Sequence, residues 1–311
     1  MRRGVVSSAA ALTAALLVGG CGASGGTPNE GTASSTAPPP GSPAAILARP
    51  GADIGLTPGT SDYARGPVRV VFLVIDGQGR SVERPTARVW VAKSLNDKPF
   101  ARTMATLEDV GVPGESEAAA GDVRNIYVTR FRIPKAGKYL LVAEPVGGKP
   151  IQGLLDLNVK EKPAAPAIGS EAFPSRTPTL ASTGGDLKAL TTRTPPDVGL
   201  LRYSVADSLK AHVPFVVTFA TPAFCQSRTC GPVVDVVDHV RKQFVGQAVR
   251  FIYVEIYANN QPPTTNRWVN EWKLPTEPWT FLVGRDGRIE ERFEGSVSAA
   301  ELEAAVRRYL G

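Results

Sequence analysis

Apolar and polar positions alternate with a period near two through much of the first half of the chain. β-branched and aromatic residues are enriched there, and turns containing glycine or proline separate the alternating stretches. This pattern is typical of β-strands that bury one face. It predicts strands at residues 68–75, 87–92, 126–133, 139–144 and 154–159. Because no long helical period interrupts them, we expect an antiparallel β-sandwich.

Helical periods alternate with apolar runs in the last third of the chain. A nearly continuous apolar run at 214–220 is typical of a central strand. One helical stripe follows it, made of Val233, Val236, Val237, Val240 and Phe244. Further strands are expected at 200–203, 249–256, 279–283 and 289–293, and further helices from Ser204, at 267–272 and at 299–310. This order predicts a three-layer α/β sandwich.

Low-complexity segments divide the chain of 311 residues, whose length suggests about two domains. We expect a signal peptide at 1–20, a flexible linker at 21–48, a β-sandwich at 49–161, a Pro-rich linker at 162–198 and an α/β domain at 199–311. The net charge of +6 is spread along the chain without a basic block. A nucleic-acid partner is therefore not expected.

The N-terminus has the features of an export signal. Met1-Arg2-Arg3 precedes an apolar stretch at 5–18 that is too short to span a bilayer. The stretch ends in Leu-Val-Gly-Gly-Cys21, which resembles the lipobox of bacterial lipoproteins. The resemblance implies lipidation of Cys21 and a protein anchored to the extracytoplasmic face of the cell membrane. That space is oxidising and permits disulfides.

The phrase Phe-Arg-Ile-Pro-Lys-Ala-Gly-Lys-Tyr at 131–139 resembles a turn of immunoglobulin-like extracellular modules. The resemblance covers a single hairpin and implies an immunoglobulin-like sandwich. This region has no cysteine pair, so an antibody-type domain is not expected. We interpret the first domain as a spacer or an interaction module.

Two cysteines follow the apolar run of the second domain, and Cys225 and Cys230 are separated by four residues. Two cysteines five apart on a regular helix are separated by about 7.5 Å of axial rise, more than the roughly 4.4–6.8 Å Cα separation of a disulfide. A bond between them requires a loop at 226–229. Because proline favours the first helical position, we expect Pro232 to open the helix and both sulfurs to precede it.

Residues 200–311 resemble the thioredoxin fold, in which the first core strand delivers a redox cysteine, and residues 215–225 stand at that place. Pro278 stands directly before the strand at 279–283, where the superfamily has a cis proline. The resemblance implies a thiol-disulfide oxidoreductase that acts on an unidentified protein partner, with Cys225 as the nucleophile and Cys230 as the resolving cysteine. The chain departs from the family because it carries C-x-x-x-x-C where thioredoxins carry C-x-x-C.

Two neighbours of the cysteines are candidate site residues. Arg228, together with the helix end, would lower a thiol pKa. Glu277 directly precedes Pro278 and would face the cysteines, as a proton acceptor or as a charge that repels some substrates.

Two alternatives to redox chemistry remain. The first is a non-enzymatic envelope module with a structural Cys225–Cys230 disulfide, which binds its partner through an aromatic rim. Trp268, Trp272 and Trp279 are the candidates for this rim, although we expect one or two of them to be core aromatics. The second is a metal site. Only His212 and His239 exist, and neither lies in the late loop where copper-delivery proteins of this fold place their histidine. We therefore expect no metal and no cofactor.

Overall fold

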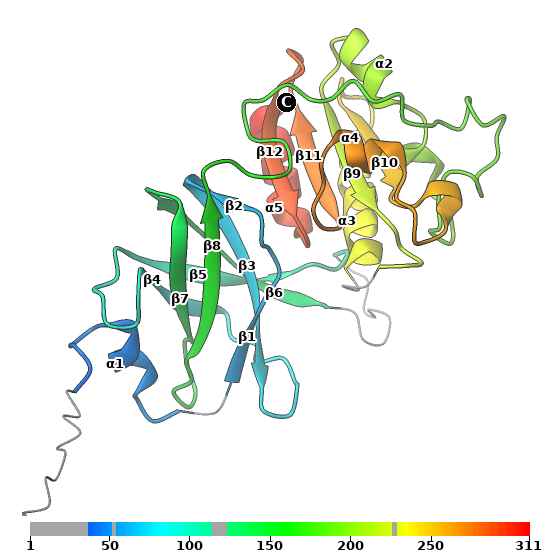
Figure 1. Cartoon of the computed structure of the whole chain (residues 1–311). Helices are drawn as coiled ribbons and strands as arrows, with labels where there is room; N and C mark the ends of the chain where they lie inside the picture. The colour runs from blue at the N-terminus through cyan, green and yellow to red at the C-terminus, as the bar shows by residue number, and fades with distance from the viewer. Residues whose placement is uncertain (1–36, 52–53, 114–122, 226–228) are drawn as a thin grey trace, which may run out of the picture. The chain divides into compact units, whose positions relative to one another are not determined.

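The computed structural model describes residues 37–51, 54–113, 123–225 and 229–311 (Figure 1). Residues 38–311 form one compact unit. The expected signal peptide, the lipidation site Cys21 and the candidate Arg228 lie outside the described residues.

The described residues of the first domain form a helix and eight strands: α1 (Pro43–Leu47), β1 (Ile54–Pro58), β2 (Tyr63–Ala64), β3 (Gly66–Asp76), β4 (Thr86–Ala92), β5 (Ala101–Asp109), β6 (Asn125–Ile133), β7 (Gly137–Pro145) and β8 (Gly153–Lys160). All five strands expected here are confirmed, as β3, β4, β6, β7 and β8. The sequence analysis missed β1, β2 and β5. In β5 only one of nine residues is fully buried, so its apolar period is weak.

Hydrogen bonds join the eight strands into one sheet in the order β1-β3-β6-β5-β4-β7-β8-β2. All neighbours are antiparallel except β2 and β8. Because β1 also contacts β8, the sheet curves back around its core, as the twist of strands allows. The first domain is therefore built on one continuous sheet, whereas the sequence predicted a sandwich of separate layers. The immunoglobulin-like assignment stays a prediction.

Helix α1 lies within the segment expected to be a flexible linker. The Ser42 side chain accepts a hydrogen bond from the Ala45 amide, and Pro43 occupies the first turn. Ile46 is only 1% exposed. Burial of Ile46 together with Pro43 accounts for ordered structure before residue 49.

The second domain contains η1 (Val198–Leu200), α2 (Val205–Lys210), β9 (Phe215–Ala220), α3 (Cys230–Gln243), β10 (Arg250–Glu255), η2 (Ala258–Asn260), α4 (Arg267–Glu271), β11 (Trp279–Val283), β12 (Ile289–Glu294) and α5 (Ala299–Tyr309). The expected strand at 200–203 is wrong. Asp197 caps the 3₁₀ turn η1 and Ser204 caps α2, and the few residues between these caps leave no room for a strand.

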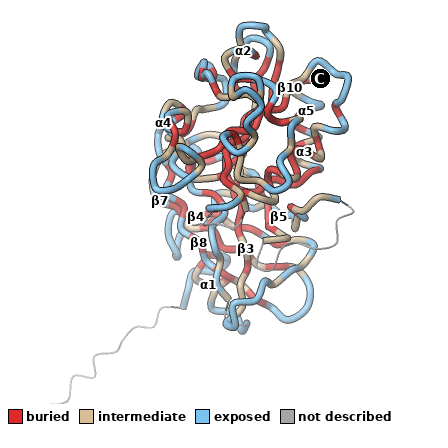
Figure 2. The backbone as a smooth tube through the Cα atoms, turned by 90° about the vertical axis from the view of Figure 1, so that its right-hand side faces the viewer, coloured by how far each residue is buried: buried red, intermediate tan, exposed pale blue. Residues whose placement is uncertain are grey.

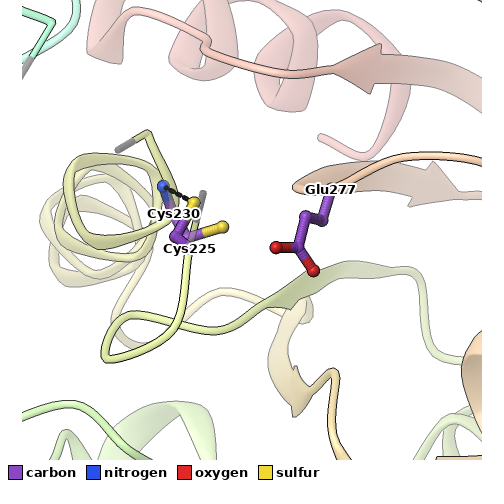
Figure 3. Close-up of side chains that lie close together, drawn as sticks. All are labelled: Cys225, Cys230 and Glu277. Atoms are coloured by element: carbon purple, nitrogen blue, oxygen red, sulfur yellow. Dashed lines mark hydrogen bonds between the residues drawn. The ribbon is translucent and has the colours of Figure 1, made fainter. Parts of the chain in front are cut away.

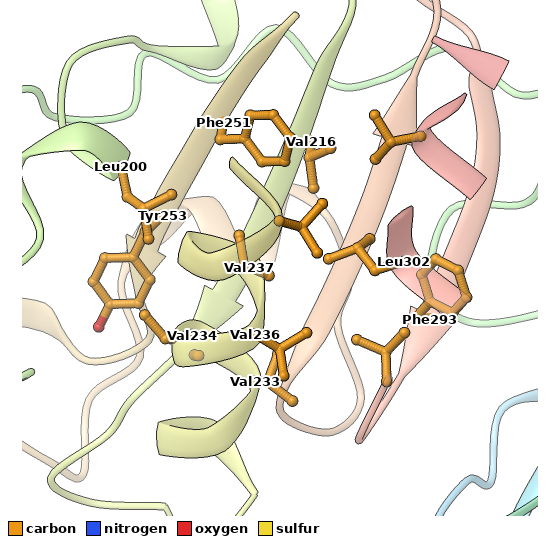
Figure 4. Close-up of a cluster of buried hydrophobic side chains, with 14 of the residues drawn as sticks. Leu200, Val216, Val233, Val234, Val236, Val237, Phe251, Tyr253, Phe293 and Leu302 are labelled. Carbon is orange, nitrogen blue, oxygen red and sulfur yellow. The ribbon is translucent and has the colours of Figure 1, made fainter. Parts of the chain in front are cut away.

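The four-stranded sheet has the order β10-β9-β11-β12, with β9 and β10 parallel and the other pairs antiparallel. Helices α3 and α5 contact each other and one face of this sheet, where their valine and leucine side chains form a core with Phe251 and Phe293 (Figure 4). The other face packs against Trp272 of the α4 region and Val205 of α2. This confirms the three-layer α/β sandwich. Buried positions concentrate in the strands of both domains (Figure 2).

The Pro-rich segment 162–198 packs along the second domain. Ala165 and Ala172 join the core on one face of the four-stranded sheet, and Leu190 joins the core on the other. The backbone of Ile289 exchanges hydrogen bonds with Gly169 and Ser170. This linker is thus part of the second domain's core and surface.

An ion pair between Arg69 on β3 and Glu301 on α5 connects the two domains. The guanidinium donates to both carboxylate oxygens, at 2.9 and 2.7 Å, and each side chain is 9% exposed. Arg69 also donates to the carbonyl of Ser296. Arg130 of β6 contacts the same carboxylate.

A second buried ion pair lies beside the first. Arg292 of β12 donates to the carboxylate and the carbonyl of Asp62. Glu294 accepts hydrogen bonds from the backbone amides of Ser61 and Asp62, at 2.9 and 2.8 Å. We call Asp62, Arg69, Arg292, Glu294 and Glu301 the interface charges.

No helix among the described residues is both long enough and apolar enough to cross a membrane.

Candidate functional site

The cysteine pair lies between the end of β9 and the start of α3. Cys225 is partly buried in the turn after the strand, and Cys230 is fully buried as the first residue of the helix. The expectation that Pro232 opens the helix is therefore wrong: α3 begins two residues earlier. Pro232 still falls in the first turn, where its missing N–H leaves no intrahelical bond unmade.

A sulfur atom serves as the cap of α3. Thr229 occupies the N-cap position but makes no side-chain cap hydrogen bond. Instead, the backbone amide of Cys230 donates to the Sγ of Cys225 at 3.2 Å. This contact explains why the helix can begin at Cys230, and it places the Cys225 sulfur at the positive end of a 14-residue helix.

Glu277 approaches the cysteines from the loop before β11. Because β11 runs antiparallel to β9, with Trp279 opposite Phe219, the start of β11 lies beside the end of β9. The Glu277–Pro278 peptide bond is cis, as the resemblance implied. Both Sγ atoms and a carboxylate oxygen of Glu277 lie within 4.8 Å of one another, with the carboxylate facing the sulfurs (Figure 3).

The surroundings raise the pKa of the Cys230 thiol well above its ordinary value. The largest cause is its hydrogen bond with Cys225, followed by burial and by the charge of Cys225. The negative charge of Glu277 also raises this pKa, whereas a backbone hydrogen bond from Thr221 lowers it. Cys230 is consequently held as a neutral thiol at neutral pH.

Cys225 and Cys230 are free cysteines in this structure. The structural disulfide of the binding-module alternative stays a prediction.

A buried hydrogen-bond network supports the turn after β9 that carries Cys225. Glu255, at the end of β10, accepts hydrogen bonds from the Tyr253 hydroxyl at 2.6 Å and from the amide and hydroxyl of Thr192 at 2.9 Å. The Thr192 hydroxyl in turn accepts from the Ala223 amide in the turn. The sequence analysis missed these residues, although a glutamate at the end of an apolar strand is a usable signal.

Two aromatic residues border the site, and neither was expected. The rings of Phe224 and Tyr257 meet edge to face, with centroids 6.3 Å apart, and Phe224 is 38% exposed. The pKa of Tyr257 is raised by burial first and then by the charges of Glu277 and the cysteines.

The tryptophans confirm the expectation of core aromatics and do not form the alternative aromatic rim. Trp272 and Trp279 are fully buried in the core. Trp268 is partly buried, and its indole donates to the carbonyl of Arg176. Burial of these large rings on the sheet face explains why they cannot form the rim.

His212 is exposed and His239 is partly exposed, and neither belongs to the group of potential metal ligands found among the described residues. His212 has a left-handed backbone conformation and contacts the carbonyl of Arg285. His239 is on α3 beside Gln243. Among the described residues, the cluster with potential metal ligands is Cys225, Cys230 and Glu277.

Comparisons with known proteins find likenesses among solved structures. No family model matches the chain, and no curated protein matches it. Among solved structures, the chain is similar to a thiol:disulfide interchange protein of the thioredoxin family from Chlorobium tepidum TLS, at 13% identity and a TM-score of 0.31. The match covers 48% of this chain and 97% of the other. So low a TM-score supports neither fold nor function by itself.

Proposed function

We propose that this protein exchanges disulfides with a partner protein through Cys225 and Cys230 of a thioredoxin-like domain. The observation that carries the proposal is the hydrogen bond from the Cys230 amide to the Cys225 sulfur at the start of α3. A backbone N–H and the helix dipole both stabilise a thiolate at that atom. Cys225 is also the more accessible of the two sulfurs, so it is the nucleophile.

The proposed reaction has two steps. The Cys225 thiolate attacks one sulfur of a partner disulfide, a mixed disulfide forms, and the partner's other sulfur leaves as a thiolate. The Cys230 thiol then loses its proton and attacks the Cys225 sulfur. This step forms the Cys225–Cys230 disulfide and releases the partner with two thiols. Two electrons pass from the cysteine pair to the partner, and the reverse sequence oxidises a dithiol.

Glu277 is the proton acceptor for the second step in this proposal. Its carboxylate lies within 4.8 Å of both sulfurs, and Cys230 must lose a proton that its surroundings hold tightly. A carboxylate at this distance can take the proton directly after a small side-chain rotation, or through one water molecule.

The location is the second part of the proposal. The export signal and Cys21 motif support a lipid-anchored protein on the extracytoplasmic face of the cell membrane. Acyl chains contribute about 0.8 kcal/mol of binding per buried CH₂ group. The first domain would then act as a spacer or a docking module between the membrane and the redox domain.

The exchange reaction is tested by trapping. The Cys230→Ser variant, exposed to the proteins of its own envelope, should accumulate mixed disulfides that disappear on reduction. The Cys225→Ser variant is the matched control and should trap none. Equal trapping by both variants, or none by the first, would contradict the proposed roles.

The anchor is tested separately. A Cys21→Ala variant should move from the membrane fraction to the soluble fraction while retaining exchange with a small disulfide substrate. Retention in the membrane fraction would argue against lipidation at Cys21.

A further inference from the structure

The cluster of Cys225, Cys230 and Glu277 combines three acidic groups that belong to different elements. The turn after β9 supplies one sulfur, the first residue of α3 supplies the other, and the loop before β11 supplies the carboxylate. Their ligand atoms lie within 4.8 Å of one another. Two thiolates and a carboxylate this close together repel one another, so a cation placed among the three would relieve their mutual repulsion.

We infer that the reduced Cys225–Cys230 pair and Glu277 form a binding site for a thiophilic divalent cation, with zinc(II) as the best fit. The site needs only reduced thiols and does not depend on the proposed exchange reaction. The sequence analysis placed Glu277 opposite the cysteines but expected no metal, because neither histidine lies where a ligand was sought.

The donor set selects the class of ion. Thiolates favour zinc and copper(I), whereas carboxylates favour harder cations. Zinc(II) accepts both, with bonds of about 2.3 Å to sulfur and about 2.0–2.2 Å to carboxylate oxygen. Mixed sulfur and oxygen ligation therefore favours zinc(II) over copper(I), magnesium or calcium.

The geometry requires only small side-chain movements. Two thiolates on a tetrahedral zinc ion are about 3.8 Å apart, and the three ligand atoms already lie within 4.8 Å of one another. Rotation about the side-chain bonds is sufficient to close that difference. Three protein ligands leave a fourth tetrahedral position for water or for a ligand from a partner.

Binding and oxidation exclude each other at this site. One zinc ion displaces the two thiol protons into solvent and forms two Zn–S bonds and one Zn–O bond, without electron transfer. A Cys225–Cys230 disulfide offers no thiolate and cannot bind. The ion would therefore protect the reduced pair and block its attack on disulfides until it is removed.

The test uses the full chain with Cys21→Ala, which leaves two of the three cysteines, and Co²⁺ as the spectroscopic probe. Titration of the anaerobic, reduced protein should give one Co²⁺ per chain, a thiolate-to-cobalt charge-transfer band and the intense visible bands of tetrahedral cobalt. Zn²⁺ should displace the cobalt. Cys225→Ser and Cys230→Ser should each weaken binding by at least about tenfold and halve the charge-transfer band or abolish it.

Glu277→Gln decides whether the carboxylate is a ligand. It should weaken Co²⁺ and Zn²⁺ binding by at least about tenfold, whereas Asp156→Asn, at an exposed position of β8, should leave both unchanged. Equal affinities for Glu277→Gln and the parent protein would overturn the three-ligand site. Absence of the charge-transfer band at millimolar Co²⁺ would overturn the metal site altogether.

The metal site and the proposed exchange reaction can be tested separately, because exchange can be measured in metal-free protein. Disulfide exchange with insulin, measured in the presence of a chelator, does not involve the ion. Exchange without cobalt binding refutes the metal site alone, and cobalt binding without exchange refutes the proposed function alone. Thermal unfolding of each variant confirms that it is folded.

Discussion

Buried acids occur in two regions of this molecule, and their neighbours differ. At the domain interface, Glu301 receives two hydrogen bonds from Arg69 and contacts Arg130. At the cysteine site, the ionisable groups that most affect the pKa of the Cys230 thiol are two other acids, Cys225 and Glu277. One region surrounds an acid with cations, and the other brings acids together.

The two environments shift pKa values in opposite directions. Burial alone would raise the pKa of the Glu301 carboxyl, but Arg69 and Arg130 outweigh burial and hold it below its ordinary value of 4.5. Around Cys230, hydrogen bonding, burial and nearby charge all raise the pKa. At the interface, the arginines keep Glu301 ionised, and its charge stabilises the structure. At the cysteine site, Cys230 keeps a proton that a reaction or a cation can remove. Four predictions test this contrast.

Loss of the interface cation should have the largest effect on stability. Arg69→Met would leave Glu301 buried with only Arg130, and would leave the Ser296 carbonyl without its donor. Removing one partner of a buried ion pair costs about 3–5 kcal/mol. Denaturant unfolding should show a loss of that order. Arg65→Ala, which removes an exposed pair with Glu161, is the matched control and should cost about 0–1 kcal/mol.

The interface should also make the protein sensitive to acid. The pKa of Glu301 is lower in the folded state than in the unfolded state, so its stabilisation is complete above the unfolded value. It is lost as the pH falls through the folded value. The free energy of unfolding should therefore rise with pH below about pH 5, less steeply in Glu301→Gln. Glu303→Gln on the same helix is the control. Identical slopes for the parent and Glu301→Gln would exclude this assignment.

The two cysteines of the site should differ in their rate of alkylation. In the reduced protein with Cys21→Ala, iodoacetamide at neutral pH should label Cys225 about tenfold faster than Cys230, or more. Cys230 is fully buried and has a raised pKa. Mass spectrometry of peptides after brief labelling identifies the first site. Preferential labelling of Cys230 would reverse the assigned roles.

The smallest expected effect concerns Glu277. Its negative charge raises the pKa of Cys230, so Glu277→Gln should lower that pKa by less than about one unit. The labelling rate of Cys230, followed against pH in metal-free protein, should reach its half-maximum at a lower pH. Asp156→Asn should leave the profile unchanged, and a shift to higher pH in Glu277→Gln would contradict the electrostatic role.

The sequence predicted elements well where the periodicity was strong. In β8, buried and exposed residues alternate strictly, and α5 begins after Ser298 as expected. Prediction failed where a tertiary contact replaced a local signal. No sequence rule anticipates that a cysteine sulfur caps α3, so the start of the helix was placed two residues late.

The candidate site was partly predictable for the same reason. The positions of Cys225, Cys230, Glu277 and Pro278 followed from the resemblance in strand order, and the structure brings the two cysteines and Glu277 together. Tyr257 and Thr192 reach the cysteine region through long-range packing, which one sequence does not encode in any local pattern. Burial of Trp272 and Trp279 likewise depends on how the sheet is covered.

The sulfur cap of α3 links helix stability to the oxidation state of the cysteines. When Cys225 is a thiolate, it is the strongest acceptor that the Cys230 amide can have. When the same sulfur enters a disulfide, it becomes a weak acceptor, and the first turn of the helix loses part of its support. Suppose that a substitution makes the first turn of α3 depend more on the hydrogen bond to the Cys225 sulfur. By thermodynamic linkage, the same substitution makes the reduced protein harder to oxidise. The hydrogen bond that supports the first helical turn is thus one contribution to the reduction potential of the pair.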